Sequence, residues 1–382
     1  MFGILIPRRE NDAPTPKLPE DLTAARQKAQ RAEIAGVLGN ARQHGFSAND
    51  YLTGPDETPL DGQLLLYANH RRYGRNNPGT YEAPQTLSAE ELSELTSGGI
   101  EVGLQTLDPP FAGYRNLQLA LTRAWQRAET DMSALDEVRE IETAMEQWRW
   151  LPRTFPNGAI LVNLPEFRLQ AVDETGQVAL EMPVIVGQRR HPTPVFAGNL
   201  QYVVFGPYWN VPASILANEI IPDIVKDRTY LQRNSYEVLD AGGTVVSKGS
   251  VSGEVLAGLR SGEFRVRQVP GAKNALGTVK FMFPNQHHVY LHDTPNHVLF
   301  AKADRALSHG CIRVSDPQAL AEWVLRGQPE WTPEHIAHSR KQTKQVQVNL
   351  PRAIPVYMLY NTVSADADGN LTRWADLYGL GR

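Results

Sequence analysis

Cysteine is almost absent from this chain: among 382 residues only Cys311 carries a thiol. A single cysteine excludes an intramolecular disulfide framework and any zinc site built from several cysteines. A lone thiol is still compatible with an oxidising compartment, because it has no partner in the chain with which to mispair.

A large charge imbalance is absent as well. Lysine and arginine number 38, aspartate and glutamate 42, and the formal net charge is −4. Basic residues are scattered, with short clusters such as QRRH at 188–191 and no long run. The chain as a whole therefore has no bias toward nucleic acid or an anionic membrane.

Long hydrophobic runs are also missing at the N-terminus. The sequence MFGILIPRRENDAPTP has a short apolar run that ends at Pro7, which cannot serve as the core of a signal peptide or as a membrane span. We expect residues 1–20 to be a proline-rich disordered lead. If the protein is exported, we expect its signal or anchor to lie outside this sequence.

The composition, 41% hydrophobic and 21% charged, is typical of a soluble globular protein, and the length favours two domains.

Helical patterns dominate residues 21–150, where SAEE at 88–91 also has the form of a capping box. Alternating strand patterns dominate residues 151–382, for example VALEMPVIVG and HHVYLHD, with the turn sequences DETGQ and DAGGT. One later helix is expected at DPQALAEWVLRG, capped by Asp316.

Residues 213–262 are polar and weakly patterned, and we interpret them as an insertion over the sheet that forms a lid. The sequence therefore predicts an α+β fold. An α-helical scaffold domain at 21–150 precedes a mostly β domain at 151–382, and the lid belongs to the second domain.

Cys311 lies in the sequence ALSHGCIRV, and a thiol becomes a useful nucleophile beside a base. His309 is two residues away, but the chain can turn at Gly310, so this imidazole need not reach the sulfur. His292 lies nineteen residues upstream at the predicted end of a strand, and a hairpin-like return brings it within reach of Cys311. The competing interpretation is a cysteine buried as a small hydrophobic residue.

Neighbouring residues fit acyl chemistry. Gly310 allows backbone N–H groups near the thiol to face a substrate oxygen, as an oxyanion hole requires. Arg313 can bind a carboxylate through two parallel hydrogen bonds. Tyr290 shares a face with His292 by the period of two. Metal chemistry is disfavoured, because no HExxH or matched histidine–carboxylate pattern occurs.

Residues 274–317, NALGTVKFMFPNQHHVYLHDTPNHVLFAKADRALSHGCIRVSDP, resemble the active-site region of L,D-transpeptidases with a YkuD-type catalytic domain. That family has a histidine, a spacer and then [S/T]-H-G-C-x-[N/R], which here selects His292 and the run from Ser308 to Arg313. Arginine in the last position is similar to the YcbB-like branch. Further similar motifs are LLYANHRRYGR at 65–75, EQWRWLP at 146–152, MPVIVG at 182–187, TPVF at 193–196 and YWNVPASI at 208–215. Residues 76–145 are too short for the peptidoglycan-binding module that many chains of this branch carry.

The resemblance implies a peptidoglycan L,D-transpeptidase. Cys311 would attack an amide carbonyl at an L-centre of a stem peptide and form an acyl-thioester, with His292 as the base. The side-chain amine of diaminopimelate on a second stem would then take the acyl group and give a 3-3 or 1-3 cross-link. The backbone carbonyl of Asp293 would orient His292.

The remaining site residues have supporting roles under this resemblance. The N–H of Cys311, together with that of Gly310, would stabilise the oxyanion, and Tyr290 would assist. Ser308, His309 and Arg313 would shape the pocket, with Arg313 meeting a carboxylate of the stem.

The resemblance also implies a periplasmic enzyme that needs no metal or organic cofactor and whose cysteine is acylated by carbapenem-type β-lactams. We expect a monomer with no nucleic-acid partner. Two alternatives stay open: a hydrolase of the same fold, in which water takes the acyl group, and a non-catalytic cell-wall-binding protein.

Overall fold

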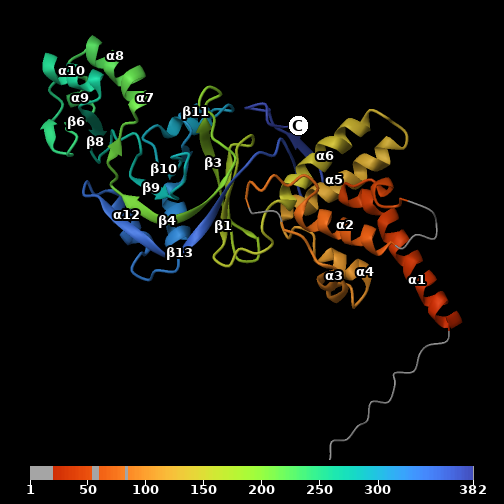
Figure 1. The fold of residues 1–382 in the computed structure, drawn as a ribbon. Coiled ribbons are helices and arrows are strands. Elements are labelled where there is room, and N and C mark those ends of the chain that lie inside the picture. The colour runs from red at the N-terminus through yellow and green to blue at the C-terminus, as the bar shows by residue number, and fades with distance from the viewer. Residues whose placement is uncertain (1–19, 54–59, 82–84, 382) are drawn as a thin grey trace, which may run out of the picture. The chain divides into compact units, whose positions relative to one another are not determined.

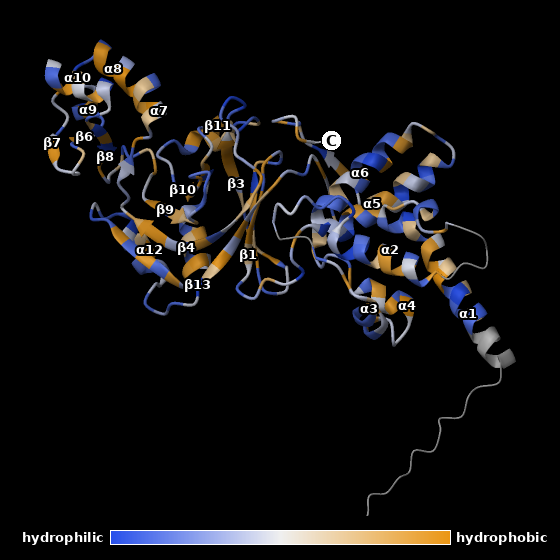
Figure 2. Cartoon of the chain, viewed as in Figure 1, coloured by the Kyte–Doolittle hydropathy of each residue, from blue (hydrophilic) through white to orange (hydrophobic). Residues whose placement is uncertain are grey.

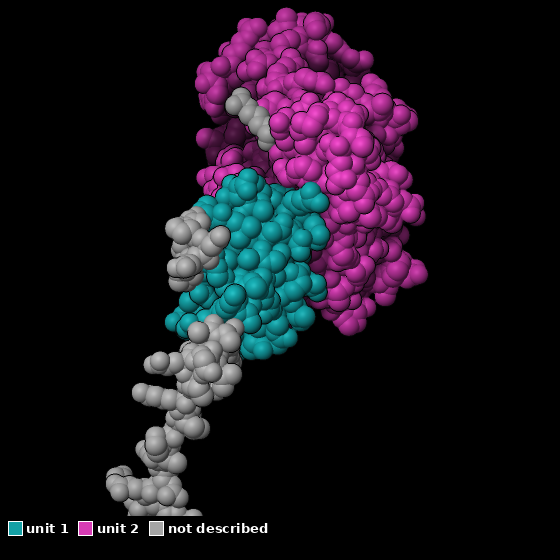
Figure 3. Space-filling view, turned by 90° about the vertical axis from the view of Figure 1, so that its right-hand side faces the viewer, with its two compact units in different colours: residues 1–72, 86–108 teal, residues 73–85, 109–382 magenta. Residues whose placement is uncertain are grey.

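The computed structural model describes residues 20–53, 60–81 and 85–381. The expected disordered lead at 1–20 lies outside these ranges except for Glu20, where the first helix begins. The chain divides into two compact units, which Figure 3 shows in separate colours: residues 1–72 with 86–108, and residues 73–85 with 109–382.

The first unit is helical. Its core is built by apolar and aromatic residues such as Leu38, Tyr67 and Leu104, all buried. Ser88 accepts a hydrogen bond from the Glu91 N–H while the Glu91 carboxylate accepts one from the Ser88 N–H, which confirms the predicted capping box. The elements of this unit are α1 (Glu20–Gly39), η1 (Ala41–His44), η2 (Ala48–Asp50), α2 (Asp61–Tyr73, whose last residue belongs to the second unit), α3 (Ala89–Leu95) and α4 (Ile100–Gln105).

Two further helices, α5 (Ala112–Ala128) and α6 (Ala134–Arg149), belong to the second unit. Their buried faces pack together and against Val363 of the small hairpin β14–β15 (Val363–Ala365 and Leu371–Arg373). The boundary of the compact units therefore does not coincide with the change from helices to strands near residue 151.

A nine-stranded sheet forms the centre of the second unit (Figure 1). The strand order is β11-β3-β12-β10-β9-β4-β13-β1-β2, and β2 also pairs with β3, so eight of the strands close into a ring. Hydrophobic residues concentrate along the strands in Figure 2 and fill one common core. The strands are β1 (Ala159–Asn163), β2 (Arg168–Val172), β3 (Val178–Gly187), β4 (Ala197–Phe205), β9 (Val279–Met282), β10 (Leu291–His292), β11 (Ala306–Ser308), β12 (Ile312–Val314) and β13 (Val346–Leu359).

Three shorter helical elements complete the sheet region: η4 (His297–Ala301), α11 (Pro317–Leu325) and α12 (Pro333–Arg340). Asp316 caps α11 by accepting a hydrogen bond from the Ala319 N–H at 2.9 Å, as the sequence predicts. The DETGQ turn likewise joins β2 to β3, with Gly176 at φ +81°.

The segment from β5 to β8, residues 209–268, forms a subdomain that we call the insertion. It contains a four-stranded sheet of order β5-β8-β6-β7 and a hydrophobic core of its own, so it is more structured than its weak sequence pattern suggests. Its elements, which gather in one group in Figure 1, are β5 (Trp209–Asn210), α7 (Ala213–Ile215), the π-helical η3 (Leu216–Ile220), α8 (Ile221–Lys226), α9 (Tyr230–Arg233), β6 (Tyr236–Leu239), β7 (Val245–Ser247), α10 (Gly253–Ser261) and β8 (Arg265–Gln268). The structure thus confirms the predicted fold class, a helical N-terminal region followed by a mostly β region.

Candidate active site

Neighbouring strands place polar side chains in one row across the sheet. His292 of β10 is the register partner of both Arg313 in β12 and Lys280 in β9. Because successive strand residues point to opposite faces, and the preceding row consists of core residues, these three side chains share the face opposite the core. The core residues of that preceding row are Leu291, Ile312 and Phe281.

Cys311 directly precedes β12 and joins this group. A hydrogen bond of 3.1 Å from the Ile312 N–H to the Tyr290 carbonyl holds the two segments together. The Cys311 thiol is half-buried, interacts with the Tyr290 hydroxyl, and donates to the backbone carbonyl of His288 at 3.8 Å. The Tyr290 and His292 rings meet edge to face, 5.6 Å apart.

No hydrogen bond joins Cys311 to His292 within the part of the chain that the structure describes. The fold brings the two residues to the same face through adjacent parallel strands, rather than through the hairpin-like return that the sequence suggests. Hydrogen bonds between nucleophile and base are often loose without substrate and tighten when it binds.

The tautomer of His292 follows from its surroundings. Its Nδ1 lies 2.5 Å from the backbone carbonyl of Asp293, and a carbonyl oxygen only accepts hydrogen bonds. Nδ1 therefore carries the proton, and Nε2 keeps the lone pair that a general base needs. The contact that the sequence-based interpretation names as the orienter of His292 is thus present in the structure.

Burial, with a further contribution from the nearby Arg313 guanidinium, lowers the pKa of His292 from 6.5 to about 3. Burial also raises the pKa of the Cys311 thiol above its ordinary value. At neutral pH the site therefore holds a neutral thiol beside a neutral imidazole, and not a preformed thiolate–imidazolium pair.

The lowered pKa of His292 predicts an unusual pH dependence. Because the imidazole stays unprotonated well below pH 6.5, kcat/KM should hold its neutral-pH value down to about pH 4. We would measure the pH–rate profile of product formation between pH 4 and 8, and an acid limb centred near 6.5 would contradict the assignment. Circular dichroism at each pH is the control, since protons bind the unfolded state better between pH 3 and 6.5 and destabilise the fold there.

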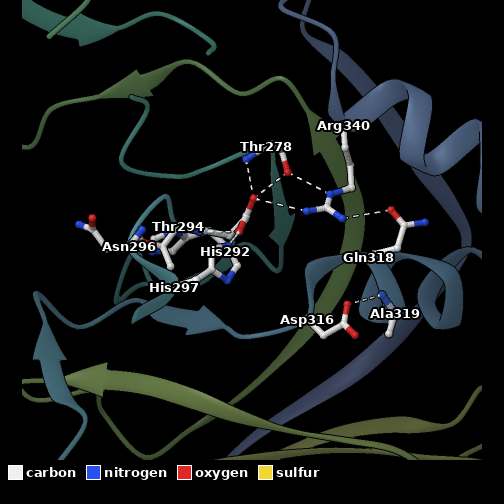
Figure 4. Close-up of polar contacts among 10 residues, drawn as sticks. Thr278, His292, Thr294, Asn296, His297, Asp316, Gln318, Ala319 and Arg340 are labelled. Atoms are coloured by element: carbon white, nitrogen blue, oxygen red, sulfur yellow. Dashed lines mark hydrogen bonds and ion pairs between the residues drawn. The ribbon is translucent and has the colours of Figure 1, made fainter. Parts of the chain in front are cut away.

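The carboxylate of Asp293 is the centre of a buried polar network. Its Oδ2 accepts hydrogen bonds from the Thr278 N–H and hydroxyl at 2.8 and 2.7 Å, and its Oδ1 accepts one from the Thr294 N–H. Figure 4 shows how Arg340 extends the network by donating to Thr278, at 3.0 Å, and to Gln318, at 3.1 Å. This network fixes the backbone that carries the Asp293 carbonyl, and so the position of His292.

Removing this carboxylate should destabilise the fold. In Asp293→Ala the donors of Thr278 and Thr294 lose their acceptor in a buried site, at a cost of about 3 kcal/mol in the free energy of unfolding. Urea denaturation measures the change. The matched control is Asp136→Ala, whose carboxylate is exposed and pairs with Arg139 on the surface, and which should cost less than about 1 kcal/mol. Equal losses in both variants would show that the network carries no special stability.

The loop before Cys311 is held by its own side chains. The Ser308 hydroxyl donates to the Cys311 carbonyl at 2.6 Å and accepts from the Gly310 N–H at 3.1 Å. Gly310 has φ +113°, a conformation that L side chains rarely adopt, and its carbonyl accepts from the Thr193 hydroxyl at 2.8 Å. The Gly310 N–H is therefore occupied by the Ser308 hydroxyl and is not the second oxyanion donor that the sequence-based interpretation expects. Of the two backbone N–H groups, only that of Cys311 is left for this role.

The contacts of His309 are with residues other than Cys311. Its Nε2 lies 2.6 Å from Oε1 of Glu219 in the insertion, and its ring lies 5.1 Å from that of His191. Both members of the ion pair are partly exposed, with 31% and 46% of their side-chain surfaces accessible. His309 is thus a contact between the Cys311 loop and the insertion.

Two residues near the thiol were missed from the sequence. Lys280 alternates with Val279 and Phe281 in VKFM, so a charged residue inside an apolar strand was a usable signal. Trp209 of the insertion lies near the Tyr290 side chain and influences its pKa, and no local pattern indicates this contact. Among the described residues no group of three or more histidine, cysteine, aspartate or glutamate side chains could hold a metal ion.

The arrangement of a thiol, a buried histidine and an SHGC loop on one sheet can be compared with known families. Residues 157–334 match the sequence model of YkuD, the L,D-transpeptidase catalytic domain. The matched region includes the insertion, β10 and the whole Cys311 loop. No helix among the described residues is long and apolar enough to cross a membrane.

A curated protein and several solved structures are similar to this chain. A Haemophilus influenzae protein named "Putative L,D-transpeptidase" is 36% identical over 228 residues, which are 60% of this chain and 45% of that protein, so the chain spans less than half of its relative. Two solved structures also resemble it weakly. An L,D-transpeptidase from Mycobacterium smegmatis has a TM-score of 0.24 at 12% identity, covering 53% of this chain and 58% of its own. L,D-transpeptidase 3 from Mycobacterium tuberculosis has a TM-score of 0.25 at 13% identity, covering 53% and 61%.

Proposed function

We propose that this chain is a periplasmic peptidoglycan L,D-transpeptidase of the YcbB-like branch, in which Cys311 is the nucleophile. The observation that carries the proposal is the shared face of Cys311 and His292, with Nε2 of His292 left free as a base. The YkuD match over residues 157–334 supports the same reaction class.

The first half-reaction forms an acyl-thioester. His292 Nε2 takes the thiol proton as the Cys311 sulfur attacks the carbonyl carbon of the donor stem. The Cys311 N–H and the Tyr290 hydroxyl stabilise the resulting oxyanion. Burial and the neighbouring Cys311 raise the pKa of Tyr290, so its hydroxyl keeps the proton that it donates. The carbon–nitrogen bond then breaks, and the leaving amine takes the proton from His292.

The second half-reaction returns the free enzyme. The side-chain amine of diaminopimelate on an acceptor stem attacks the thioester carbonyl and gives its proton to His292. The carbon–sulfur bond breaks, the new amide leaves as a cross-link, and the Cys311 sulfur recovers its proton from His292. Ser308 and Gly310 hold the loop, His309 anchors the insertion, and Arg313 binds a carboxylate of the stem.

One experiment tests this function. The protein is incubated with disaccharide-tetrapeptide and the products are read by mass spectrometry, which also identifies the stem carbonyl in the new bond as 3-3 or 1-3. Cross-linked dimers are the expected result. Free tripeptide without dimers would favour the hydrolase, and no turnover by either the parent or Cys311→Ala would leave only a binding role.

A covalent probe gives an independent reading of the nucleophile. A carbapenem should acylate Cys311 and raise the mass of the intact protein by one adduct, because a ring-strained β-lactam carbonyl is open to attack by an activated thiol. Since no other cysteine is present, the adduct should be absent from Cys311→Ser under the same conditions. An adduct of equal yield on that variant would place the reaction elsewhere.

A further inference from the structure

Two cations beside the thiol have no carboxylate partner among the described residues. Lys280 is half-buried, and its Nζ lies 5.9 Å from the centre of the Tyr290 ring. Arg313 is also half-buried, and its Nε is buried without a hydrogen-bond partner. Unpaired charges in such positions are costly, and proteins retain them where a ligand supplies the opposite charge.

The charges of the site do not balance in the resting state. His292 and Cys311 are both neutral at neutral pH, whereas Lys280 and Arg313 are positive. Burial lowers the pKa of both cations. Proton transfer from Cys311 to His292 adds no net charge to the site, so two anions are needed to balance the two cations.

The register sets the distance between the cations. Arg313 and Lys280 lie on β12 and β9, with β10 and His292 between them, so their backbones are about 10 Å apart by two strand spacings. Their flexible side chains point to the same face and lie on either side of His292. Two carboxylates on one extended peptide can therefore approach the two cations while the scissile carbonyl lies near Cys311.

We propose that Lys280 and Arg313 form a subsite for two carboxylates of the donor peptide, and that Lys280 selects a free diaminopimelate carboxylate over an amidated one. This inference rests on the proposed function. A neutral amide in the same place would leave Lys280 half-buried without a counter-charge, so the amidated donor is disfavoured.

The test compares disaccharide-tetrapeptides whose diaminopimelate carboxylate is free or amidated, on the full chain. The parent should prefer the free form by about tenfold or more in kcat/KM, as expected for a charged hydrogen bond. In Lys280→Met the free form should lose that advantage and both donors should reach a similar kcat/KM. Lys280→Arg should keep the preference, and so should the matched control Lys302→Met, which removes an exposed lysine outside the site.

Two further readouts separate the possible failures. Because the Lys280 charge lowers the pKa of the Cys311 thiol, the pH profile of Cys311 alkylation by iodoacetamide should move to higher pH in Lys280→Met, while the loss of kcat/KM should fall on the free donor alone. A shift in that profile together with an equal loss on both donors would assign Lys280 to the thiol and overturn the subsite. Calorimetric binding of both donors to Cys311→Ala tests the preference without turnover. If the parent makes no product, the proposed function fails, while equal binding of free and amidated donors refutes the subsite alone.

Discussion

Replacing Cys311 by alanine should reduce cross-link formation by at least about 10⁴-fold. The thiol is the only cysteine of the chain and shares its sheet face with His292, so no other residue can form the thioester. Removing a nucleophile leaves only binding and oxyanion stabilisation, which cannot replace the covalent step. Dimer formation from disaccharide-tetrapeptide, followed by mass spectrometry, gives the rate.

The fold should survive this change, which makes the loss interpretable. Cys311 is half-buried, its strongest local contacts are made by its backbone, and the Ser308 hydroxyl continues to bind the Cys311 carbonyl in the variant. A thermal melt within a few degrees of the parent is the control. Residual turnover above about one per cent in a folded variant would rule out Cys311 as the nucleophile.

Replacing His292 by alanine should reduce turnover by about 10²–10⁴-fold, the usual contribution of a positioned general base. The thiol has a raised pKa, so without a base its neutral form attacks very slowly. His292 is 5% exposed and hydrogen-bonds to the Asp293 carbonyl, so no water or other side chain takes its place in the row. The measurement is the same dimer assay, together with alkylation of Cys311 by iodoacetamide.

His309→Ala is the matched control for His292→Ala, because His309 is the histidine nearest to Cys311 in the sequence. It breaks a partly exposed pair with Glu219, which is worth at most about 1 kcal/mol, so turnover should stay within about tenfold of the parent. His292→Asn preserves a donor toward the Asp293 carbonyl and should be as inactive as the alanine variant. Equal total loss in His309→Ala and His292→Ala would leave the base unassigned.

Local signals in the sequence were sufficient for much of the fold. The capping box at Ser88, the cap at Asp316 and the DETGQ turn were predicted because each depends on residues within four positions of one another. The change from helical to strand patterns near residue 151 was equally readable, since periods of 3.6 and 2 differ over a few residues. The helices of the insertion were missed, because short and polar elements that fold over a small core leave a weak periodic pattern.

The rest of the site could not be predicted from the sequence, because it depends on the pairing of strands that are distant along the chain. Lys280, His292 and Arg313 are separated by 12 and 21 residues, and only the register of β9, β10 and β12 shows that they form one row. The hydrogen bond that occupies the Gly310 N–H and the pair between His309 and Glu219 depend likewise on loop conformation and on the docking of the insertion. Neither follows from residue type or spacing.

The sequence by itself determined that a lone cysteine follows a histidine in an SHGC context, within a β-rich region behind a helical one. Through its resemblance to the L,D-transpeptidases it also favoured His292 over His309 as the base for Cys311, an assignment that stays a prediction. Only the tertiary structure decided the proton position on His292, the neutral resting charges of the pair, and the two unpaired cations around them. Those properties depend on burial and on distances between strands that are remote along the chain, because solvation and charge act through space and not along the sequence.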